Sequence, residues 1–203
     1  MVWTDNSTAT TSTNYEVFFR KSTNGGNTFG STINLSSNTG FSFVPRIALA
    51  GSTVYVTWED DAPGNPFEIF FKKSPNGGST FGSAINLSSN TGVSLGPQIA
   101  VFGSNVYVTW GDNTPGNYEI FFKKSPNGGS TFGSAINLSS NSGVSLYGLQ
   151  IAASGGNAYV VWQDDTPGNT FGNFDILFRK SNGGTINLSN SPGNSIGPQI
   201  AIS

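Results

Sequence analysis

Residues 125–139 read SPNGGSTFGSAINLS, and the same residues recur at 74–88. A looser copy, STNGGNTFGSTINLS, occupies residues 22–36, and a shortened copy, SNGGTINLS, occupies residues 181–189. The chain is therefore one unit of roughly fifty residues written four times, which is a length typical of structural repeats.

Each repeat has the pattern of four β-strands. In the third repeat a short apolar run at 98–101 follows Gly96 and Pro97, and NVYVTW at 105–110 alternates polar and apolar side chains. The turn DNTPGN at 112–117 leads to YEIFFK at 118–123, and a PNGG turn leads to AINL at 135–138. β-Branched and aromatic residues between Pro- and Gly-rich turns are typical of short strands.

The tryptophans mark the period of the repeat. Trp3, Trp58, Trp110 and Trp162 are separated by 55, 52 and 52 residues. Four strands in a period of about fifty residues indicate a β-propeller with one blade per repeat. A single four-stranded sheet cannot bury both of its faces, so each blade has to pack on its neighbours around an axis.

The phase of the repeats predicts how the ring closes. The chain enters at the second strand of a blade, at Val2 and Trp3, and ends on a first strand at 198–201. We predict an all-β propeller of four blades of four antiparallel strands, in which the C-terminal strand completes the N-terminal blade and removes the open sheet edges. The alternative is that two chains exchange this strand and form an eight-bladed ring.

The whole chain, residues 1–203, is predicted to be a single propeller domain. Its repeats fall at about 1–43 (completed by 197–203), 44–95, 96–146 and 147–196. The strand pattern begins directly after Met1, which we expect of a domain excised from a longer protein.

The composition argues against several kinds of function. Charged residues make up only 10% of the chain and the net charge is −2, so there is no basic surface for nucleic acid. No apolar run approaches the roughly 18 residues of a membrane helix. His and Cys are absent, which removes the commonest general base and all thiolate chemistry. Low charge with many Ser, Thr and Asn favours an extracellular or cell-surface protein.

The turn segments at 22–29, 74–81 and 125–132 resemble the Asp-box, the bacterial neuraminidase repeat with the pattern Ser-x-Asp-x-Gly-x-Thr-Trp. In that family the box joins the third and fourth strands of propeller blades. This chain has Asn in place of the Asp and Phe in place of the Trp, and its fourth copy at 181–184 has lost a residue and the aromatic. The resemblance implies a sialidase-like propeller in which Asn still shapes the turn and Phe fills the space between strands.

The same resemblance implies an arginine triad, a Tyr and Glu nucleophile pair and an Asp acid. Two of the three arginines, Arg20 and Arg179, stand where the other repeats have lysine, so no triad carries over. We therefore expect that the protein is not an enzyme. The alternative is a sialidase-like or other glycoside hydrolase relative, which needs two carboxylates at a set separation.

Four acids share the position two residues after each Trp: Asp5, Asp60, Asp112 and Asp164. They begin the turns that contain Pro-Gly-Asn and should circle one rim of the ring. A ring of carboxylate and amide oxygens suits calcium, a hard cation that prefers oxygen ligands. The alternative is a local side-chain turn at each corner, with no metal.

Most other charges also follow the repeat. The exceptions are the acids Glu59, Asp61 and Asp165 and the base Arg46. An enzyme site on a symmetric ring normally breaks the symmetry, because one substrate needs different groups on different sides. The scarcity of such departures argues against catalysis.

Two further sets of residues are candidates for ligand binding. Arg46, Gln98, Gln150 and Gln199 share a position on the innermost strands, where we expect them to line the axial channel and hold water or a sugar. Tyr15 and Tyr118 begin third strands beside Asn-rich turns. Aromatic and amide groups together suit sugar rings, and the alternative for both sets is a structural role in the channel wall or between blades.

We predict a non-catalytic extracellular binding or scaffold module. Near-identical blades would present equivalent pockets, which favours multivalent binding of a glycan or another cell-surface ligand. A glycoside hydrolase relative and a purely structural repeat of a larger surface protein are the alternatives. No cofactor is expected apart from the hypothesised calcium, no nucleic acid is expected, and a closed monomer is favoured over a homodimer.

Overall fold

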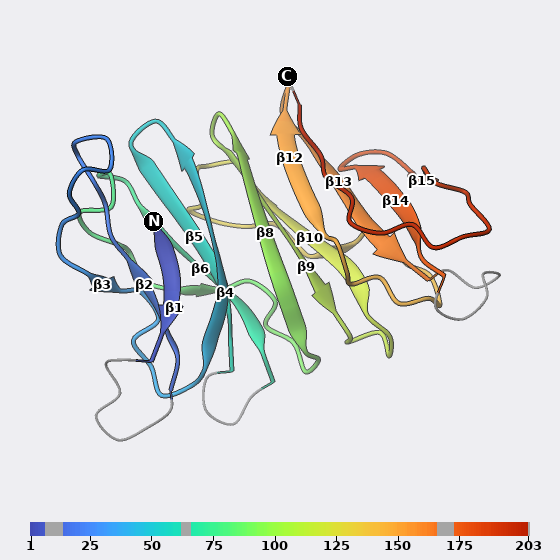
Figure 1. Ribbon diagram of the computed structural model, residues 1–203, viewed down its shortest axis with the longest axis horizontal. Helices are drawn as coiled ribbons and strands as arrows, with labels where there is room; N and C mark the ends of the chain where they lie inside the picture. The colour runs from blue at the N-terminus through green and yellow to red at the C-terminus, as the bar shows by residue number, and fades with distance from the viewer. Residues whose placement is uncertain (7–13, 62–65, 166–172, 203) are drawn as a thin grey trace.

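The computed structural model describes residues 1–6, 14–61, 66–165 and 173–202. These residues form fifteen β-strands and no helix (Figure 1). Among them, no helix is long and apolar enough to cross a membrane.

The strands form four antiparallel sheets, and each sheet follows the chain order. The first sheet contains β1 (Val2–Asp5), β2 (Glu16–Phe19) and β3 (Ile33–Asn34). The second contains β4 (Ser42–Ala50), β5 (Thr53–Asp60), β6 (Glu68–Ser74) and β7 (Ile85–Asn86). The third contains β8 (Ser94–Phe102), β9 (Asn105–Asp112), β10 (Glu119–Ser125) and β11 (Ile136–Asn137). The fourth contains β12 (Gln150–Ser154), β13 (Asn157–Asp164), β14 (Asp175–Lys180) and β15 (Thr185–Asn187).

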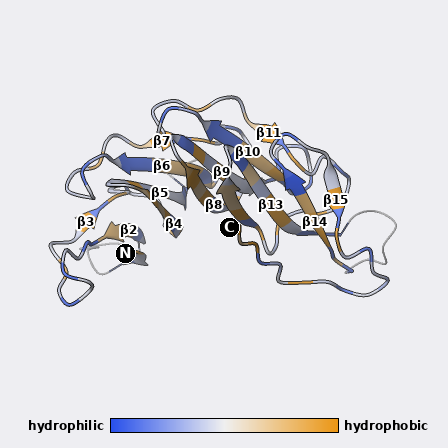
Figure 2. Cartoon of the chain, turned by 90° about the horizontal axis from the view of Figure 1, so that it is seen from above, coloured by the Kyte–Doolittle hydropathy of each residue, from blue (hydrophilic) through white to orange (hydrophobic). Residues whose placement is uncertain are grey.

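The four sheets are the blades of a propeller, which confirms the predicted fold class. Figure 2 shows them as an open fan, with β3, β7, β11 and β15 on the outer rim, β4 and β8 towards the centre and both chain ends on the open side. Within each sheet, strands that follow each other in the chain lie side by side, because turns of Pro, Gly and Asn return the chain directly to its neighbour.

The hydrophobic core lies between the blades and is divided into three clusters that are built alike. Between the second and third blades, Tyr55, Ile69, Phe71 and Leu87 pack against Val106, Val108 and Trp110. The other two clusters join the first blade to the second and the third to the fourth. Trp58, Trp110 and Trp162 are at most 1% exposed, so each blade inserts its tryptophan into the preceding blade.

The Asn-Gly-Gly turns also join neighbouring blades. The Asn76 side chain accepts from the Thr80 amide at 3.0 Å and donates to the Thr80 hydroxyl at 2.9 Å, which fixes the turn that resembles the Asp-box. Phe81, at the end of this turn, packs edge-on against Phe19 of the first blade with ring centroids 5.1 Å apart. The phenylalanine therefore fills the space between blades rather than a space within its own blade.

The predicted closure of the ring is not formed. Among the described residues the first sheet has three strands, β1 pairs only with β2, and residues 196–202 belong to no strand. The C-terminal segment instead lies against the fourth blade, where the Gly197 amide donates to Gln163 Oε1 at 2.9 Å. A physical reason lies in the last linker: the position held by Asn38, Asn90 and Asn141 in the other linkers is Ser191, which has no side-chain amide to reach the next blade.

The packing of turns on the preceding blade predicts that two equivalent glycines respond differently to substitution. Gly129 has φ of 72°, and a Cβ there would lie 2.6 Å from Phe71 Cζ. Gly26 has φ of 92°, but a Cβ there would meet no described atom within 4 Å. We expect Gly26→Ala to cost about 1 kcal/mol from backbone strain alone, and Gly129→Ala to cost roughly 2–4 kcal/mol. Urea unfolding at a concentration where the protein is a single chain measures both, and equal losses in that species would contradict this account of the interface.

Candidate functional site

Three of the four acids that follow a Trp are buried, each in its own hydrogen-bonded cage of the same composition. Asp60, Asp112 and Asp164 are at most 1% exposed. Asp112 Oδ2 accepts the Trp110 indole at 3.1 Å, the Ser94 hydroxyl at 2.8 Å and the Asn90 amide at 2.6 Å. The equivalent Trp, Ser and Asn donors surround the other two: Trp58, Ser42 and Asn38 for Asp60, and Trp162, Ser145 and Asn141 for Asp164.

A second set of acids at the start of the third strand is also buried, and it consists of Glu16, Glu68, Glu119 and Asp175. Glu68 accepts a hydrogen bond from the Ser88 hydroxyl and from the Asn90 amide N–H, the latter at 3.0 Å. Asn90 therefore bonds through its backbone to the second blade and through its side chain to Asp112 of the third blade. Asn38 and Asn141 make the same pair of contacts at the neighbouring junctions.

The described acids do not form the calcium ring considered above. Among the described residues no group of three or more acids is placed to hold a metal ion. Asp60, Asp112 and Asp164 lie in different blades, with their oxygens directed to Trp, Ser and Asn donors, and Thr114 additionally caps Asp112. This geometry favours the local turn over the metal. The equivalent turns at 62–65 and 166–172 lie outside the described residues.

A groove of about 410 Å³ runs along the innermost strands and brings together residues from three blades. Its polar lining consists of Arg46 from β4, Glu59 from β5, Gln98 from β8, Tyr147 and Gln150. Its apolar lining includes Val44, Leu95, Leu146 and Leu149. The predicted channel residues Arg46, Gln98 and Gln150 therefore do meet, whereas Gln199 does not line the groove and is exposed on the C-terminal segment.

Arg46 and Glu59 are fixed by contacts across the blades that form the groove. Arg46 Nε donates to Gln98 Oε1 at 3.3 Å, and Glu59 Oε2 accepts the Gly96 amide at 2.9 Å. Burial raises the pKa of Glu59, and the Gly96 amide and the charge of Arg46 oppose part of that shift. The groove thus contains one fixed cation and one carboxyl group whose proton is held more tightly than usual.

Glu59 and Tyr147 were absent from the predicted site, although the repeat contains the signal for both. Glu59 stands where the next two blades have Gly111 and Gln163. Tyr147 belongs to a stretch that is one residue longer than its counterparts between the Ser and the Gln of the innermost strand. Tyr147 is 54% exposed. Three departures from the repeat, Arg46, Glu59 and Tyr147, therefore lie in the groove beside the repeated Gln98 and Gln150.

Of the predicted aromatic residues at the start of the third strands, Tyr15 packs between blades and Tyr118 is half-buried. Tyr15 contacts Phe43 with ring centroids 5.2 Å apart. Tyr118 lies near the groove, and burial raises the pKa of its phenol, with smaller contributions from Tyr147, Asp112 and Glu59. Neither tyrosine lines the groove. Their position agrees with the alternative of inter-blade packing.

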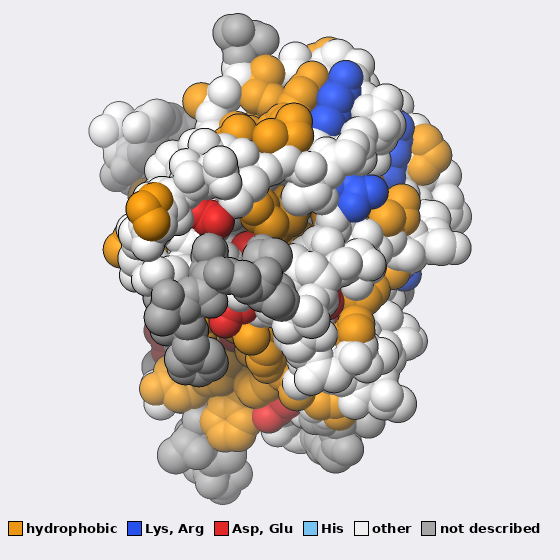
Figure 3. Space-filling view, turned by 90° about the vertical axis from the view of Figure 1, so that its right-hand side faces the viewer, with side chains coloured by type: hydrophobic (Ala, Val, Ile, Leu, Met, Phe, Trp, Pro, Cys, Tyr) orange, Lys and Arg blue, Asp and Glu red, His pale blue; other side chains and the backbone are white. Residues whose placement is uncertain are grey.

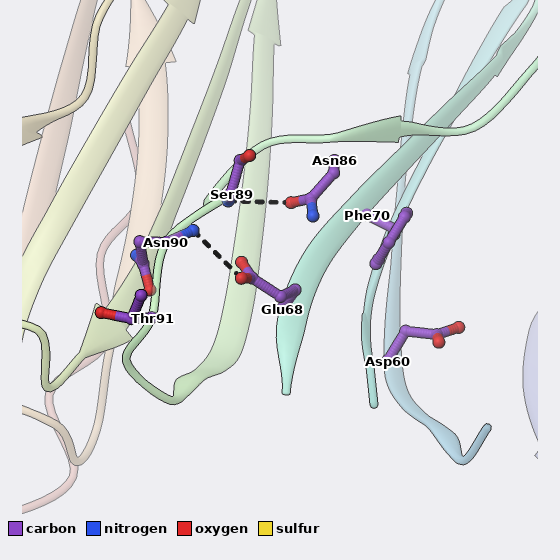
Figure 4. A pocket seen from close by; sticks show the side chains of 7 residues that line it. All are labelled: Asp60, Glu68, Phe70, Asn86, Ser89, Asn90 and Thr91. Carbon is purple, nitrogen blue, oxygen red and sulfur yellow. Dashed lines mark hydrogen bonds between the residues drawn. The ribbon is translucent and has the colours of Figure 1, made fainter. Parts of the chain in front are cut away.

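A second cavity, of about 350 Å³, lies beside the linker between the second and third blades (Figure 4). It is lined by Asp60, Glu68, Phe70, Asn86, Ser89, Asn90 and Thr91. Figure 4 shows Asn90 bonded to Glu68 and Ser89 bonded to Asn86, the latter at 2.9 Å. Many of its polar atoms are thus already engaged within the protein.

Comparisons with solved structures agree on the fold. An ulvan lyase of a polysaccharide lyase family, described in complex with -[GlcA(1-4)Rha3S]-, has a TM-score of 0.60 at 11% identity over 89% of this chain and 51% of that chain. An α-L-arabinanase from Penicillium chrysogenum, complexed with arabinobiose, has a TM-score of 0.56 at 11% identity over 90% and 57%. A mutant Trypanosoma rangeli sialidase has a TM-score of 0.50 at 15% identity over 69% and 28%.

These neighbours are β-propeller enzymes that act on carbohydrates, and identities of this size show the fold alone. The chain spans between 28% and 57% of the length of the three structures. No protein-family model matches the sequence, and no curated protein sequence matches it. The class that the fold defines is therefore the sialidase-like β-propeller architecture.

The cage around Asp112 predicts a large loss of stability when its acceptor is removed. Asp112→Ala would leave the Trp110, Ser94 and Asn90 donors without their buried partner, at a cost of about 3 kcal/mol or more. Ser134→Ala, at an exposed position of the same blade, should change the free energy of unfolding by less than about 0.5 kcal/mol. Denaturant unfolding of the two variants compares them, and a small effect at Asp112 would contradict a structural role.

The protonation of Glu59 predicts a pH dependence of opposite sign to that of an ordinary native carboxylate. Because the pKa of Glu59 is raised on folding, its contribution to stability is complete below pH 4.5, the ordinary pKa of a glutamate, and declines as pH rises through the raised pKa. Glu59→Gln keeps an acceptor for Gly96, as Gln163 does for Gly197. We expect this variant to fold and to lose that decline in stability above pH 4.5, as measured by thermal unfolding across pH. A pH profile identical to that of the unmodified protein would contradict the assignment.

Proposed function

We propose that the protein is a non-catalytic, extracellular carbohydrate-binding propeller and that a glycan binds in the groove of the innermost strands. The observation that carries this proposal is the convergence of departures from the repeat. Arg46, Glu59 and Tyr147 are each peculiar to their own repeat, and all three line one groove. A symmetric scaffold that becomes asymmetric at one place is suited to one asymmetric ligand.

The groove has the chemistry that sugars require. The Arg46 guanidinium and the amides of Gln98 and Gln150 offer donors and acceptors for hydroxyl groups, and the Tyr147 ring offers an exposed aromatic surface. Ligand sites of on the order of 300–1,000 Å³ are usual for small molecules, and about 410 Å³ falls within that range. A short oligosaccharide segment matches this size.

The structural neighbours support a carbohydrate ligand. The ulvan lyase and the arabinanase are described with bound saccharides, and a sialidase shares the architecture. Because sequence identity is 11–15%, this support concerns the class of ligand and not the particular sugar. The low charge of the chain and its many Ser, Thr and Asn residues also favour an extracellular location.

The carboxyl groups argue for binding rather than hydrolysis. Glycoside hydrolysis generally uses two carboxyl groups flanking the scissile bond, and the described lining of the groove contains one, Glu59. Asp112 contributes to the electrostatic environment of the nearby Tyr118, but its cage recurs at Asp60 and Asp164, as expected of a structural group. A catalytic role would require a second acid outside that cage.

The second cavity supports a different mode of binding. Its carboxylate and amide residues recur at equivalent positions in the first and third blades, among them Glu16, Asn34, Glu119 and Asn137. Repeated pockets of this kind would bind several sugars per chain and gain avidity. The two modes differ in stoichiometry, with one ligand per chain for the groove and several for the repeated pockets.

A glycan-array screen followed by variants of the groove tests the proposal. The unmodified protein should bind a sugar class equally with calcium and with chelator, because the proposed site uses no metal. Arg46→Ala should weaken binding of the best ligand by about tenfold or more, the equivalent of about 1.4 kcal/mol, with little change in stability because Arg46 is exposed. Lys124→Ala, on the third strand of another blade, serves as the matched control.

If no glycan on the array binds under either condition, the carbohydrate-binding proposal is overturned, and the alternative of a purely structural repeat module is favoured. Loss of binding with chelator would favour the calcium hypothesis. Cleavage of the bound glycan that disappears in Glu59→Gln would instead favour the glycoside hydrolase alternative.

A further inference from the structure

Each junction between blades is made from the same two complementary surfaces. The preceding blade contributes what we call the receiving face, which at the second blade consists of Tyr55, Ile69, Phe71 and Leu87. The following blade contributes what we call the inserting face, which at the third blade consists of Val106, Val108 and Trp110 together with Gly129 and Phe132 of its turn. Phe132 packs on Phe71 with ring centroids 5.0 Å apart.

The first blade also has an inserting face, but the described residues leave it more exposed than the inserting faces of the other three blades. Trp3 is half-buried, whereas its three equivalents are at most 1% exposed. Phe29, the equivalent of Phe132, is 43% exposed, and Met1, the equivalent of Val108, is 64% exposed. A Cβ on Gly26 would meet no described atom within 4 Å, whereas one on Gly129 would meet Phe71.

The fourth blade presents the matching receiving face at the opposite end of the fan. It consists of Tyr159, Ile176, Phe178 and Leu188, the equivalents of the four residues at the second blade. Leu188 is 57% exposed, whereas Leu35, Leu87 and Leu138 are fully buried. Figure 3 views this end of the molecule and shows hydrophobic side chains exposed among polar ones.

The C-terminal segment already follows the path of the first strand of a next blade. The Ser195 amide donates to the Phe174 carbonyl at 2.7 Å, as the Ser94 amide donates to the Phe67 carbonyl at 2.7 Å. Gly197 donates to Gln163 as Gly96 donates to Glu59. Residues 197–201 repeat the sequence GPQIA of residues 96–100, which belong to the strand that pairs with β9.

Polar contacts between blades also indicate that the first blade is complementary to the fourth. Lys72 donates to the Leu35 carbonyl at 2.6 Å, and Arg179 donates to the Leu138 carbonyl at 2.6 Å, each from the following blade to the preceding one. At the open ends the equivalent pair is Arg20 of the first blade and the carbonyl of Leu188. Arg20 is exposed and bonds to Thr32 of its own blade at 2.7 Å.

We infer that two copies of this chain join head to tail, each inserting its first blade against the fourth blade of the other and receiving that copy's C-terminal strand. The two faces lie at opposite ends of an open fan, so they are placed to meet a second copy and not each other (Figure 2). Two such contacts close an eight-bladed ring with no open sheet edge.

The mass in solution tests the inference. Size-exclusion chromatography with light scattering should give twice the chain mass of 21.3 kDa for the unmodified protein. Phe29→Asp should reduce this to a single chain mass with unchanged circular dichroism, because the charge falls in the new interface and Phe29 is already exposed. Phe102→Asp, at a residue that is also 43% exposed but lies on the β8–β9 hairpin, should remain a dimer.

A cysteine pair distinguishes exchange between copies from closure within one chain. Gln98 lies opposite the residue before Trp110, and Arg46 lies opposite the residue before Trp58. In the same register, Gln199 of one copy should lie opposite Val2 of the other copy, because Val2 precedes Trp3. The chain has no cysteine, so Val2→Cys with Gln199→Cys introduces the only pair. Oxidation should give a covalent dimer on non-reducing gels, and mixing the two single variants should give a disulfide-linked dimer containing one of each.

Three results would overturn the inference. The unmodified protein could remain at one chain mass at all concentrations. The double-cysteine variant could form its disulfide within a single chain, which would restore the four-bladed ring. The species could grow beyond two copies, which would mean that the same faces build an open filament.

Discussion

Asn90 holds together two buried carboxylates that belong to consecutive blades, and the rest of the structure depends on this contact. Its backbone amide donates to Glu68 and its side chain donates to Asp112. A carboxylate buried without donors would cost several kcal/mol, so each acid requires the linker to be in place. The acid, the linker and the next blade are therefore ordered together, and the spacing of the blades follows from the reach of one amide side chain.

This arrangement explains why the charges in the sequence follow the repeat. The acids that follow the repeat anchor the linkers, as Glu68 and Asp112 do through Asn90. Seven of the eleven acids of the chain are buried members of these two sets: Glu16, Asp60, Glu68, Asp112, Glu119, Asp164 and Asp175. Burial would raise the pKa of Asp112, but the donors from Thr114, Asn90 and Ser94 together outweigh it and hold that pKa below its ordinary value. The carboxylate therefore stays ionised inside the protein at neutral pH, and its stabilising contribution declines as pH falls below 3.8, the ordinary pKa of an aspartate, and through that lowered pKa.

The repeat allowed the fold to be predicted, because strand alternation, turn residues and tryptophan spacing all point to the same unit. The number of blades followed from counting. The closure could not be predicted in the same way, because the rotation from one blade to the next depends on how side chains such as Phe81 and Phe19 pack, and periodicity does not contain that angle. The expected channel residues Arg46, Gln98 and Gln150 did meet, since equivalent positions on neighbouring inner strands must be close.

The site was harder to predict because repeat symmetry and ligand specificity make opposite demands on the sequence. A position that supports the scaffold is repeated from blade to blade, as Asp60 and Asp112 are, and this regularity makes it easy to recognise in the sequence. A position that serves one ligand is expected to depart from the repeat, and such a departure, like Glu59 where the next blades have Gly111 and Gln163, resembles random variation in the sequence. Only the folded arrangement shows that several such departures share one groove. In proteins built from near-identical repeats, the residues that differ and also meet in space are therefore the better guide to function.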